Sequence, residues 1–374
     1  MDEKKRTVDG EYPVALTDLL AEVADGGGSD LHISAGRRPT MRKNGVLVEL
    51  DAPVLRPADT QALVYSIMSE EHRNRFERHW DVDFACSIPG VARYRVNAYY
   101  QRGSVGAACR YLPPSVGDFH ALGIPEIMAE LAVKPRGLVL VTGPAGSGKT
   151  TTLASVIDYI NRSQQVHIIT IEDPVEYLHT DQCAIVTQRE VGVDTKSFAE
   201  AVRYVLRQDP DIVVVGEMRD LATISAALTA AETGHLVFAT LHTQDAAQTI
   251  DRIIDVFPPH QQEQIRVQLS TTLMGVCTQQ LLPTRDGRGR CVACELLIPT
   301  PAVRNLIREG KTHQIYSVMQ TGTAFGMQTM DAALADLVRR GFITRDLAIK
   351  RSSDPGGLER LLVGQPVAAA AAGR

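Results

Sequence analysis

The chain has 374 residues, more than one hydrophobic core usually supports, so we expect two domains. Hydrophobic residues make up 44% of the chain and charged residues 22%, a balance that excludes disorder as the default state. The 39 basic and 44 acidic residues leave a net charge of −5 without a long basic run. This charge gives no reason to expect a nucleic-acid partner.

The amino-terminal stretch is polar, and no uninterrupted apolar segment approaches the ~18 residues of a transmembrane helix. We therefore expect a cytoplasmic protein without a transmembrane segment, which reaches a membrane only through a partner. The six cysteines are scattered except for Cys291 and Cys294. Because a structural zinc site would need a second such pair, we expect reduced thiols.

Residues 1–112 predict a small α+β domain. Apolar spacing predicts helices over 14–25 and 57–80, and alternation predicts strands over 29–34, 39–50, 81–88 and 91–100. Asn44-Gly45 predicts a hairpin turn. Pro113 and Pro114 open the predicted linker, residues 113–121, because two prolines prevent strand or helix from continuing.

Several arginines stand near the end of this first domain. Arg95 shares a strand face with its neighbours at period two, and Arg102 and Arg110 follow it. A solvated strand face is one interpretation. Arginine also makes bidentate contacts with phosphate, and these three are our candidates for a phosphate contact made across a subunit boundary in a closed ring.

A phosphate-binding loop is predicted at residues 143–150, with the sequence GPAGSGKT. An apolar run over 138–142 precedes it, and helical spacing of apolar residues follows it, which is the strand–loop–helix context that the loop requires. Lys149 would reach the β- and γ-phosphates of ATP, and the Thr150 hydroxyl would ligate Mg²⁺. The predicted nucleotide-binding residues are Gly143, Pro144, Ala145, Gly146, Ser147, Gly148, Lys149, Thr150 and Thr151.

Residues 122–374 predict an α/β domain with a mostly parallel sheet. Buried strands over 166–171, 212–215 and 235–241 are followed by Glu172, Glu217 and His242, respectively. Carboxyl ends of parallel strands meet at one edge of a sheet, so we expect these side chains to converge on the phosphate-binding loop. Beyond residue 260 we expect mainly helices with a hairpin at 284–289, and a frayed tail over 367–374.

This arrangement suggests a catalytic assignment. Glu217 is the predicted general base for water attack, and Glu172 is a second acid that shapes the water or the metal site. His242 is the predicted sensor of the γ-phosphate. His235 would lie at the other end of the same strand, roughly 23 Å away at ~3.3 Å per residue, and is expected to be structural.

Four segments carry a resemblance to a known family. Residues 143–150, 170–176, 209–220 and 234–243 resemble the Walker A, Asp box, Walker B and His box of secretion-superfamily ATPases. Residues 302–309 and the short amino-terminal part are similar to those of type IV pilus retraction ATPases within that superfamily. The resemblance implies a PAS-like first domain, a RecA-like second domain and a homohexamer that hydrolyses ATP. It also implies a platform-protein partner at the inner face of the cytoplasmic membrane.

Thr300 and Pro301 predict a helix start, as an N-cap followed by proline. The resemblance favours a motor-coupling or partner-facing role for the following segment, while a solvated basic face is the alternative. The residues concerned are Arg304, Asn305, Leu306 and Arg308.

Two other functions fit the same motifs. One is a nucleotide-gated scaffold with little turnover. The other is a type II secretion or DNA-uptake ATPase of the same superfamily, which shares the chemistry and differs in its partner.

Overall fold

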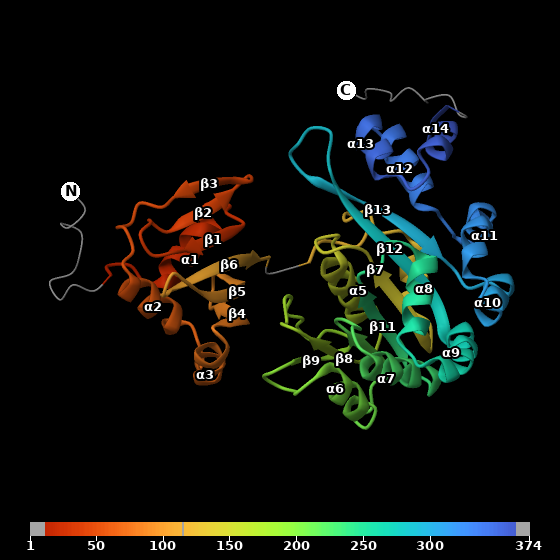
Figure 1. Ribbon diagram of the computed structural model, residues 1–374, viewed down its shortest axis with the longest axis horizontal. Coiled ribbons are helices and arrows are strands. Elements are labelled where there is room, and N and C mark those ends of the chain that lie inside the picture. Colours follow the sequence, from red (N-terminus) through yellow and green to blue (C-terminus); the bar gives the residue numbers. More distant parts are fainter. Residues whose placement is uncertain (1–11, 114–115, 364–374) are drawn as a thin grey trace. The chain divides into compact units, whose positions relative to one another are not determined.

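The structure is a computed structural model, which describes residues 12–113 and 116–363 (Figure 1). Pro114, in the expected linker, and the expected tail over 367–374 lie outside the described residues. The chain divides into two compact units. Pro174–Leu178 belongs to the first unit although the residues on both sides of it belong to the second.

The described part of the first unit contains a six-stranded antiparallel sheet in the order β3-β2-β1-β6-β5-β4. The predicted helical stretch 57–80 is two helices, because the Ser69 hydroxyl accepts a hydrogen bond from the His72 amide and starts the second one. Strand β6 was not predicted. The bounds are α1 Leu16–Asp25, β1 Asp30–Ile33, β2 Thr40–Lys43, β3 Val46–Glu49, α2 Pro57–Ser66, α3 Glu70–His79, β4 Asp81–Ile88, β5 Ala92–Gln101 and β6 Ser104–Leu112.

Two tight turns shape this sheet. Asn44 and Gly45, with φ of 51° and 82°, join β2 to β3 and confirm the predicted hairpin. Arg102 and Gly103, with φ of 50° and 74°, join β5 to β6 in the same way. Arg102 therefore lies at a hairpin tip.

The second unit contains a seven-stranded sheet in the order β13-β12-β7-β11-β10-β8-β9. Among these described strands, β13 alone runs antiparallel to its neighbour. The strands are β7 Gly137–Thr142, β8 His167–Glu172, β9 Ile185–Glu190, β10 Ile212–Val215, β11 Leu236–Leu241, β12 Leu273–Pro283 and β13 Arg290–Leu297.

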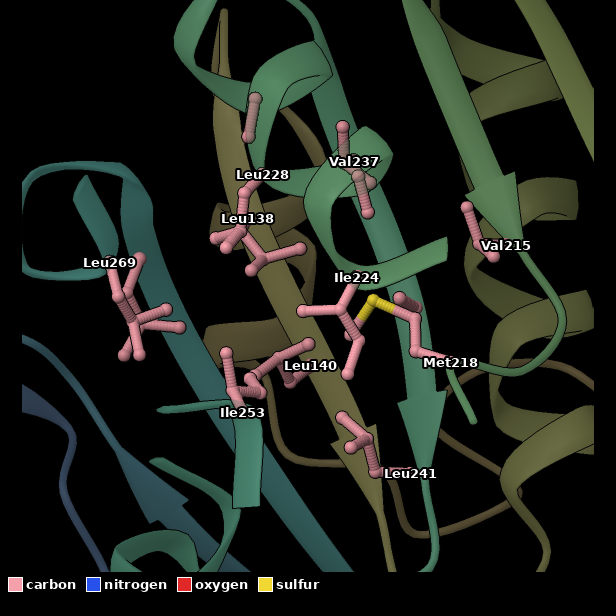
Figure 2. Packing of buried hydrophobic residues seen from close by; sticks show 14 of the residues in the cluster. Leu138, Leu140, Val215, Met218, Ile224, Leu228, Val237, Leu241, Ile253 and Leu269 are labelled. Atoms are coloured by element: carbon pink, nitrogen blue, oxygen red, sulfur yellow. The ribbon is translucent and has the colours of Figure 1, made fainter. Parts of the chain in front are cut away.

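Helices cover both faces of this sheet, which is why its central strands are uninterrupted apolar runs. On one face Leu138 and Leu140 pack with Ile224 and Leu228 of α7 (Figure 2). The other face packs against α5. The helices up to this point are α4 Ile127–Ala132, α5 Lys149–Ser163, α6 Phe198–Val205, α7 Leu221–Glu232 and α8 Ala246–Asp255.

The expectation of mainly helices beyond residue 260 is wrong for 273–297, which form β12 and β13. Strand β12 lies between β7 and β13, so its side chains are buried on both faces and do not alternate in polarity. Such a run cannot be told from a buried helix by periodicity. The hairpin at 284–289 is confirmed. The helices here are α9 Pro259–Thr272, α10 Pro301–Arg308, α11 Ile315–Thr321, α12 Met330–Arg339, α13 Arg345–Arg351 and α14 Pro355–Val363, with 3₁₀ turns at Thr312–Gln314 and Thr323–Phe325.

All six cysteines fall within the described residues and are free thiols. Within 12–113 and 116–363, no helix combines the length and the apolar character needed to cross a bilayer.

Candidate nucleotide-binding site

The loop between β7 and α5 depends on glycine at two positions. Gly143 has φ of 137°, and a Cβ there would lie 2.4 Å from the Gln279 carbonyl oxygen and 2.6 Å from the Ser147 Oγ. Gly148 has φ of 94° and is the N-cap of α5. Side chains are disfavoured at both positions, so the backbone can approach a phosphate closely at the positive end of α5.

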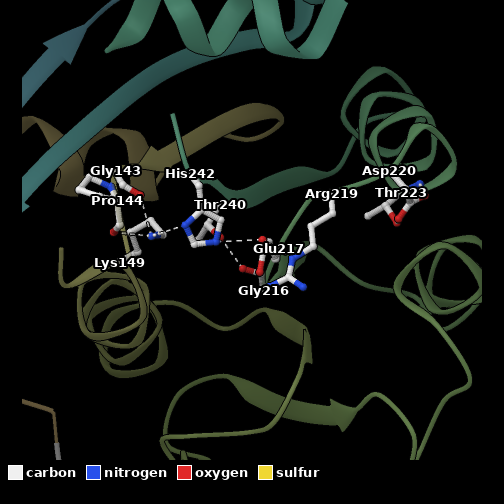
Figure 3. Close-up of polar contacts among 10 residues, drawn as sticks. All are labelled: Gly143, Pro144, Lys149, Gly216, Glu217, Arg219, Asp220, Thr223, Thr240 and His242. Atoms are coloured by element: carbon white, nitrogen blue, oxygen red, sulfur yellow. Dashed lines mark hydrogen bonds and ion pairs between the residues drawn. The ribbon is translucent and has the colours of Figure 1, made fainter. Parts of the chain in front are cut away.

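The Lys149 side chain folds back onto this loop (Figure 3). Its Nζ donates to the carbonyl oxygens of Gly143 at 2.8 Å and Pro144 at 3.0 Å. Burial lowers the pKa of Lys149, and the negative charge of Glu217 partly opposes this shift. The ammonium group is therefore held where the loop would hold a phosphate. Thr150 follows in the first turn of α5 and is exposed, and Thr151 is half-buried.

His242 connects Lys149 to Glu217. Its Nδ1 lies 3.4 Å from the Lys149 Nζ, and its Nε2 lies 2.9 Å from the Glu217 Oε1. Arg219 donates from Nε to the same carboxylate oxygen, and this contact raises the pKa of the guanidinium (Figure 3). Side chains that follow β7, β11 and β10 are thus connected by a continuous series of polar contacts, the polar chain of this site. The catalytic roles of its residues stay predictions.

Thr240, on the last part of β11, was missed by the sequence reasoning. Its hydroxyl donates to the Gly216 carbonyl oxygen, and its own carbonyl oxygen accepts from the Met218 amide at 3.0 Å. These two bonds fix the backbone on either side of Glu217. The available signal was a polar residue inside an apolar strand.

Glu172 is the last residue of β8, and its carboxylate accepts hydrogen bonds from β8 itself and from the neighbouring edge strand β9. Its Oε1 receives the Thr170 hydroxyl at 2.6 Å and the Gln188 amide at 3.1 Å. His235, at the other end of β11 from His242, has its Nδ1 3.1 Å from the Ala230 carbonyl oxygen. That placement agrees with a structural role.

Two of the three candidate arginines, Arg95 and Arg110, have acidic neighbours in the first unit. Arg95 lies 3.3 Å from the Glu176 Oε1 and 3.7 Å from the Asp83 Oδ1. Arg110 pairs with Asp30 at 3.0 Å, although 70% of its side chain is exposed. A phosphate from another subunit would have to draw Arg95 and Arg110 from these pairs, so their role across a boundary stays a prediction.

A magnesium ion would meet oxygen donors here. Mg²⁺ binds carboxylates and hydroxyls together with waters and substrate phosphates, and rarely uses an all-protein cage. In the described part of the chain, no three His, Cys, Asp or Glu side chains form a cage for a metal. The Thr150 hydroxyl, exposed in the first turn of α5, is an oxygen donor of this kind, and its role as a magnesium ligand stays a prediction.

The model of the type II/IV secretion system protein family matches residues 9–344. The chain belongs to this family of secretion ATPases. Over 340 residues it is 50% identical to the type IV pilus retraction ATPase PilT of Pseudomonas aeruginosa, covering 91% of this chain and 98% of that one. It is 49% identical to a twitching motility protein of Neisseria gonorrhoeae, covering 84% of each chain.

Solved structures agree with this assignment. A crystal structure of the pilus retraction motor PilT with bound ADP matches with a TM-score of 0.86 and 52% identity, covering 93% of this chain and 99% of that one. The ATPase DotB of Legionella pneumophila matches with a TM-score of 0.78 and 29% identity, covering 90% and 95%. The predicted fold class, an α+β amino-terminal domain followed by a P-loop ATPase domain, is confirmed.

In the segment expected to face a partner, two of the four residues are half-buried and two are exposed. The Arg304 guanidinium is half-buried and donates to the carbonyl oxygens of Ser270, of Thr271 at 3.0 Å and of Leu273 at 3.0 Å. It therefore caps the carboxyl end of α9. Leu306 is half-buried against the core, while Asn305 and Arg308 are exposed. A partner-facing role stays a prediction, and Asn305 and Arg308 have the accessible side chains.

Replacing Arg304 tests the capping role. We expect Arg304→Ala to lower the free energy of unfolding by about 2 kcal/mol, because three carbonyl oxygens lose a charged donor. Arg308→Ala, on the same helix but exposed, should change it by less than about 0.5 kcal/mol. Urea denaturation followed by circular dichroism measures both. Equal, small changes in the two variants would contradict the capping role.

Glu295 was also missed, although a lone carboxylate inside the apolar strand β13 was a signal. It is buried, and its carboxylate accepts from the Ala246 amide at 2.8 Å and the Met330 amide at 3.4 Å. It thereby joins the first residues of α8 and α12. Burial raises the pKa of Glu295 to about 7. Ala246 begins α8 four residues after His242, so Glu295 anchors the helix that follows the His242 loop.

The raised pKa makes stability depend on pH. A carboxyl group with a higher pKa in the folded state stabilises the fold fully below its unfolded pKa, and this contribution is lost as pH rises through about 7. We expect the wild type to lose on the order of 3 kcal/mol relative to Glu295→Gln between pH 4.5 and pH 8. Urea titrations of both proteins across this range measure the difference. Parallel pH profiles would show that Glu295 does not titrate in this way.

Proposed function

We propose that this chain hydrolyses ATP and uses the free energy to retract type IV pili as a homohexamer. The observation that carries the proposal is the polar chain from Lys149 through His242 to Glu217 at the carboxyl ends of three adjacent strands. The similarity to PilT over almost the whole chain supports ATP as the substrate and retraction, rather than assembly, of the pilus.

ATP would be held by the backbone amides of residues 143–151. Lys149 would leave the Gly143 and Pro144 carbonyl oxygens for the β- and γ-phosphates, which offer it a full negative charge in place of a dipole. The Thr150 hydroxyl would ligate Mg²⁺, with the carboxylates nearby oriented through water. When bound, this ion neutralises charge that develops on the phosphates.

Hydrolysis requires a group that takes a proton from water. Glu217 is that general base, and Glu172 shapes the water from the end of the neighbouring β8. His242 already contacts both Lys149 and Glu217, so it can report on whether a γ-phosphate is present between them. Arg219 holds the Glu217 carboxylate in a fixed orientation.

The partners follow from the proposed process. A homohexamer places Arg95, Arg102 or Arg110 of one subunit at the phosphates of the next. The protein would act in the cytoplasm at the inner face of the membrane, on the platform protein of the pilus. Exposed Asn305 and Arg308 on α10 are the side chains we assign to that coupling.

Two substitutions test the enzymatic part. We expect Lys149→Ala to abolish binding of ATP, because the phosphates lose their cation. Glu217→Gln should retain binding and lower kcat by about 10²–10⁴-fold, because an amide cannot accept the proton. Steady-state phosphate release, fluorescent-nucleotide binding and pilus retraction in a complemented deletion strain are the measurements.

The same experiment separates the alternatives. Equal, low rates in wild type and Glu217→Gln would favour the nucleotide-gated scaffold. Normal turnover without any effect of the deletion on retraction would favour a secretion or DNA-uptake role.

The arginine assignment predicts complementation between subunits. We expect Arg95→Ala or Arg110→Ala to spare ATP binding and lower turnover by about 10³-fold, as loss of an arginine finger does. Mixing either variant with Lys149→Ala should restore part of the activity, because some boundaries then combine an intact lysine with an intact arginine. Arg78→Ala, an exposed arginine of the same unit, is the control. Mixtures that stay inactive at every ratio would contradict a role across the boundary.

A further inference from the structure

A cavity of about 480 Å³ lies beside the phosphate-binding loop. Loop residues 144–147 line it, together with the end of β12 and the last two residues of α13, Lys350 and Arg351. These two side chains come from a helix about two hundred residues beyond the loop in the sequence. They lie outside the four segments that resemble the family motifs.

The charge of this cavity has one sign. Of its described lining residues, the charged ones are Lys350 and Arg351, and both are cations. Both are exposed, and within the described ranges neither makes an ion pair. The helix dipole accounts for basic residues at the carboxyl end of α13. It does not account for their position against the predicted phosphate-binding loop.

Ser147 adds an independent observation. Its side chain is 3% exposed, and its hydroxyl has no hydrogen-bond partner among the described residues. A buried hydroxyl without a partner is costly and needs an explanation, and a bound anion that accepts its hydrogen bond is one such explanation. Ser147 lines the same cavity as the two cations.

We propose that Lys350 and Arg351 bind phosphoryl oxygens at the loop, and so supply cations to the phosphate site from within the same subunit. This inference rests on the proposed function, because it takes a nucleotide as the occupant of the loop. A neighbouring cavity of about 520 Å³ shares Arg351 and is lined by Asp245, Glu295 and Asp354. Arg351 thus stands between a phosphate loop and a set of carboxylates.

The contact would give the carboxyl-terminal helices a direct response to the nucleotide. A phosphate at the loop would draw Arg351 towards it, and after its departure Arg351 would still line the cavity that it shares with Asp245 and Asp354. Inorganic phosphate released by hydrolysis has the same chemistry as the nucleotide's terminal phosphate, so the test includes both.

The test compares the full-length wild type with the double variant Lys350→Gln/Arg351→Gln. Affinities for ATP, ADP and pyrophosphate come from displacement of a fluorescent ADP analogue, and the affinity for inorganic phosphate comes from calorimetry. We expect the double variant to bind ATP, ADP and pyrophosphate about 10-fold or more weakly, with a shallower dependence on salt. The charge-preserving pair Lys350→Arg/Arg351→Lys should retain most of the affinity. Arg345→Gln, at the start of α13 and paired with Glu359, should have no effect.

Weaker binding of inorganic phosphate alone would support the phosphoryl site and identify released phosphate as its ligand. Unchanged affinity of the double variant for all four ligands would overturn the inference. The variant Lys149→Ala, measured alongside, separates this failure from a failure of the proposed function. If Lys149→Ala abolishes ATP binding and the double variant does not weaken it, the nucleotide site stands and Lys350 and Arg351 are not part of it. If Lys149→Ala also binds ATP normally, the proposed function itself fails.

Discussion

The structure of this site depends on the lateral order of three parallel strands. Strand β11 lies between β7, which leads into the phosphate-binding loop, and β10, which leads to Glu217. Neighbouring strands are about 4.8 Å apart, so β7 and β10, on either side of β11, are separated by two spacings, or about 10 Å. The residue that follows β11 must bridge that gap. His242 does so, because its two ring nitrogens point to opposite neighbours, Lys149 and Glu217.

The same strand order gives the charged side chains of the site polar partners within the site itself. Lys149 is held by two carbonyl oxygens of its own loop, and Glu217 is held by His242 and Arg219. A bound triphosphate carries enough negative charge to compete for Lys149, and removing Lys149 from His242 changes the surroundings of Glu217 in the same step. Binding of a triphosphate and the surroundings of the Glu217 carboxylate would therefore be coupled through the imidazole ring of His242.

The sequence was sufficient to predict the strand ends but not their neighbours. Uninterrupted apolar runs bounded by Gly143, Glu217 and His242 mark buried parallel strands, and the carboxyl ends of such strands share an edge. The lateral order is a tertiary property that no local pattern carries. Strand β12 was mistaken for helix because both faces are buried. The roles of Arg304 and Glu295 depend on the backbone carbonyls and amides of distant helix ends, which the sequence does not place.

A series of contacts leads from His242 through Glu295 to the carboxyl-terminal helices and back to the phosphate-binding loop. From His242 the chain enters α8, whose first amide is bound by Glu295, and the same carboxylate binds the first amide of α12. Helices α12 and α13 lead to Arg351, which lines the cavity at the phosphate-binding loop. A displacement of His242 would therefore reach the carboxyl-terminal helices through a buried carboxylate rather than through exposed side chains. Because burial raises the pKa of Glu295 to about 7, the strength of this connection depends on the protonation of its carboxyl group.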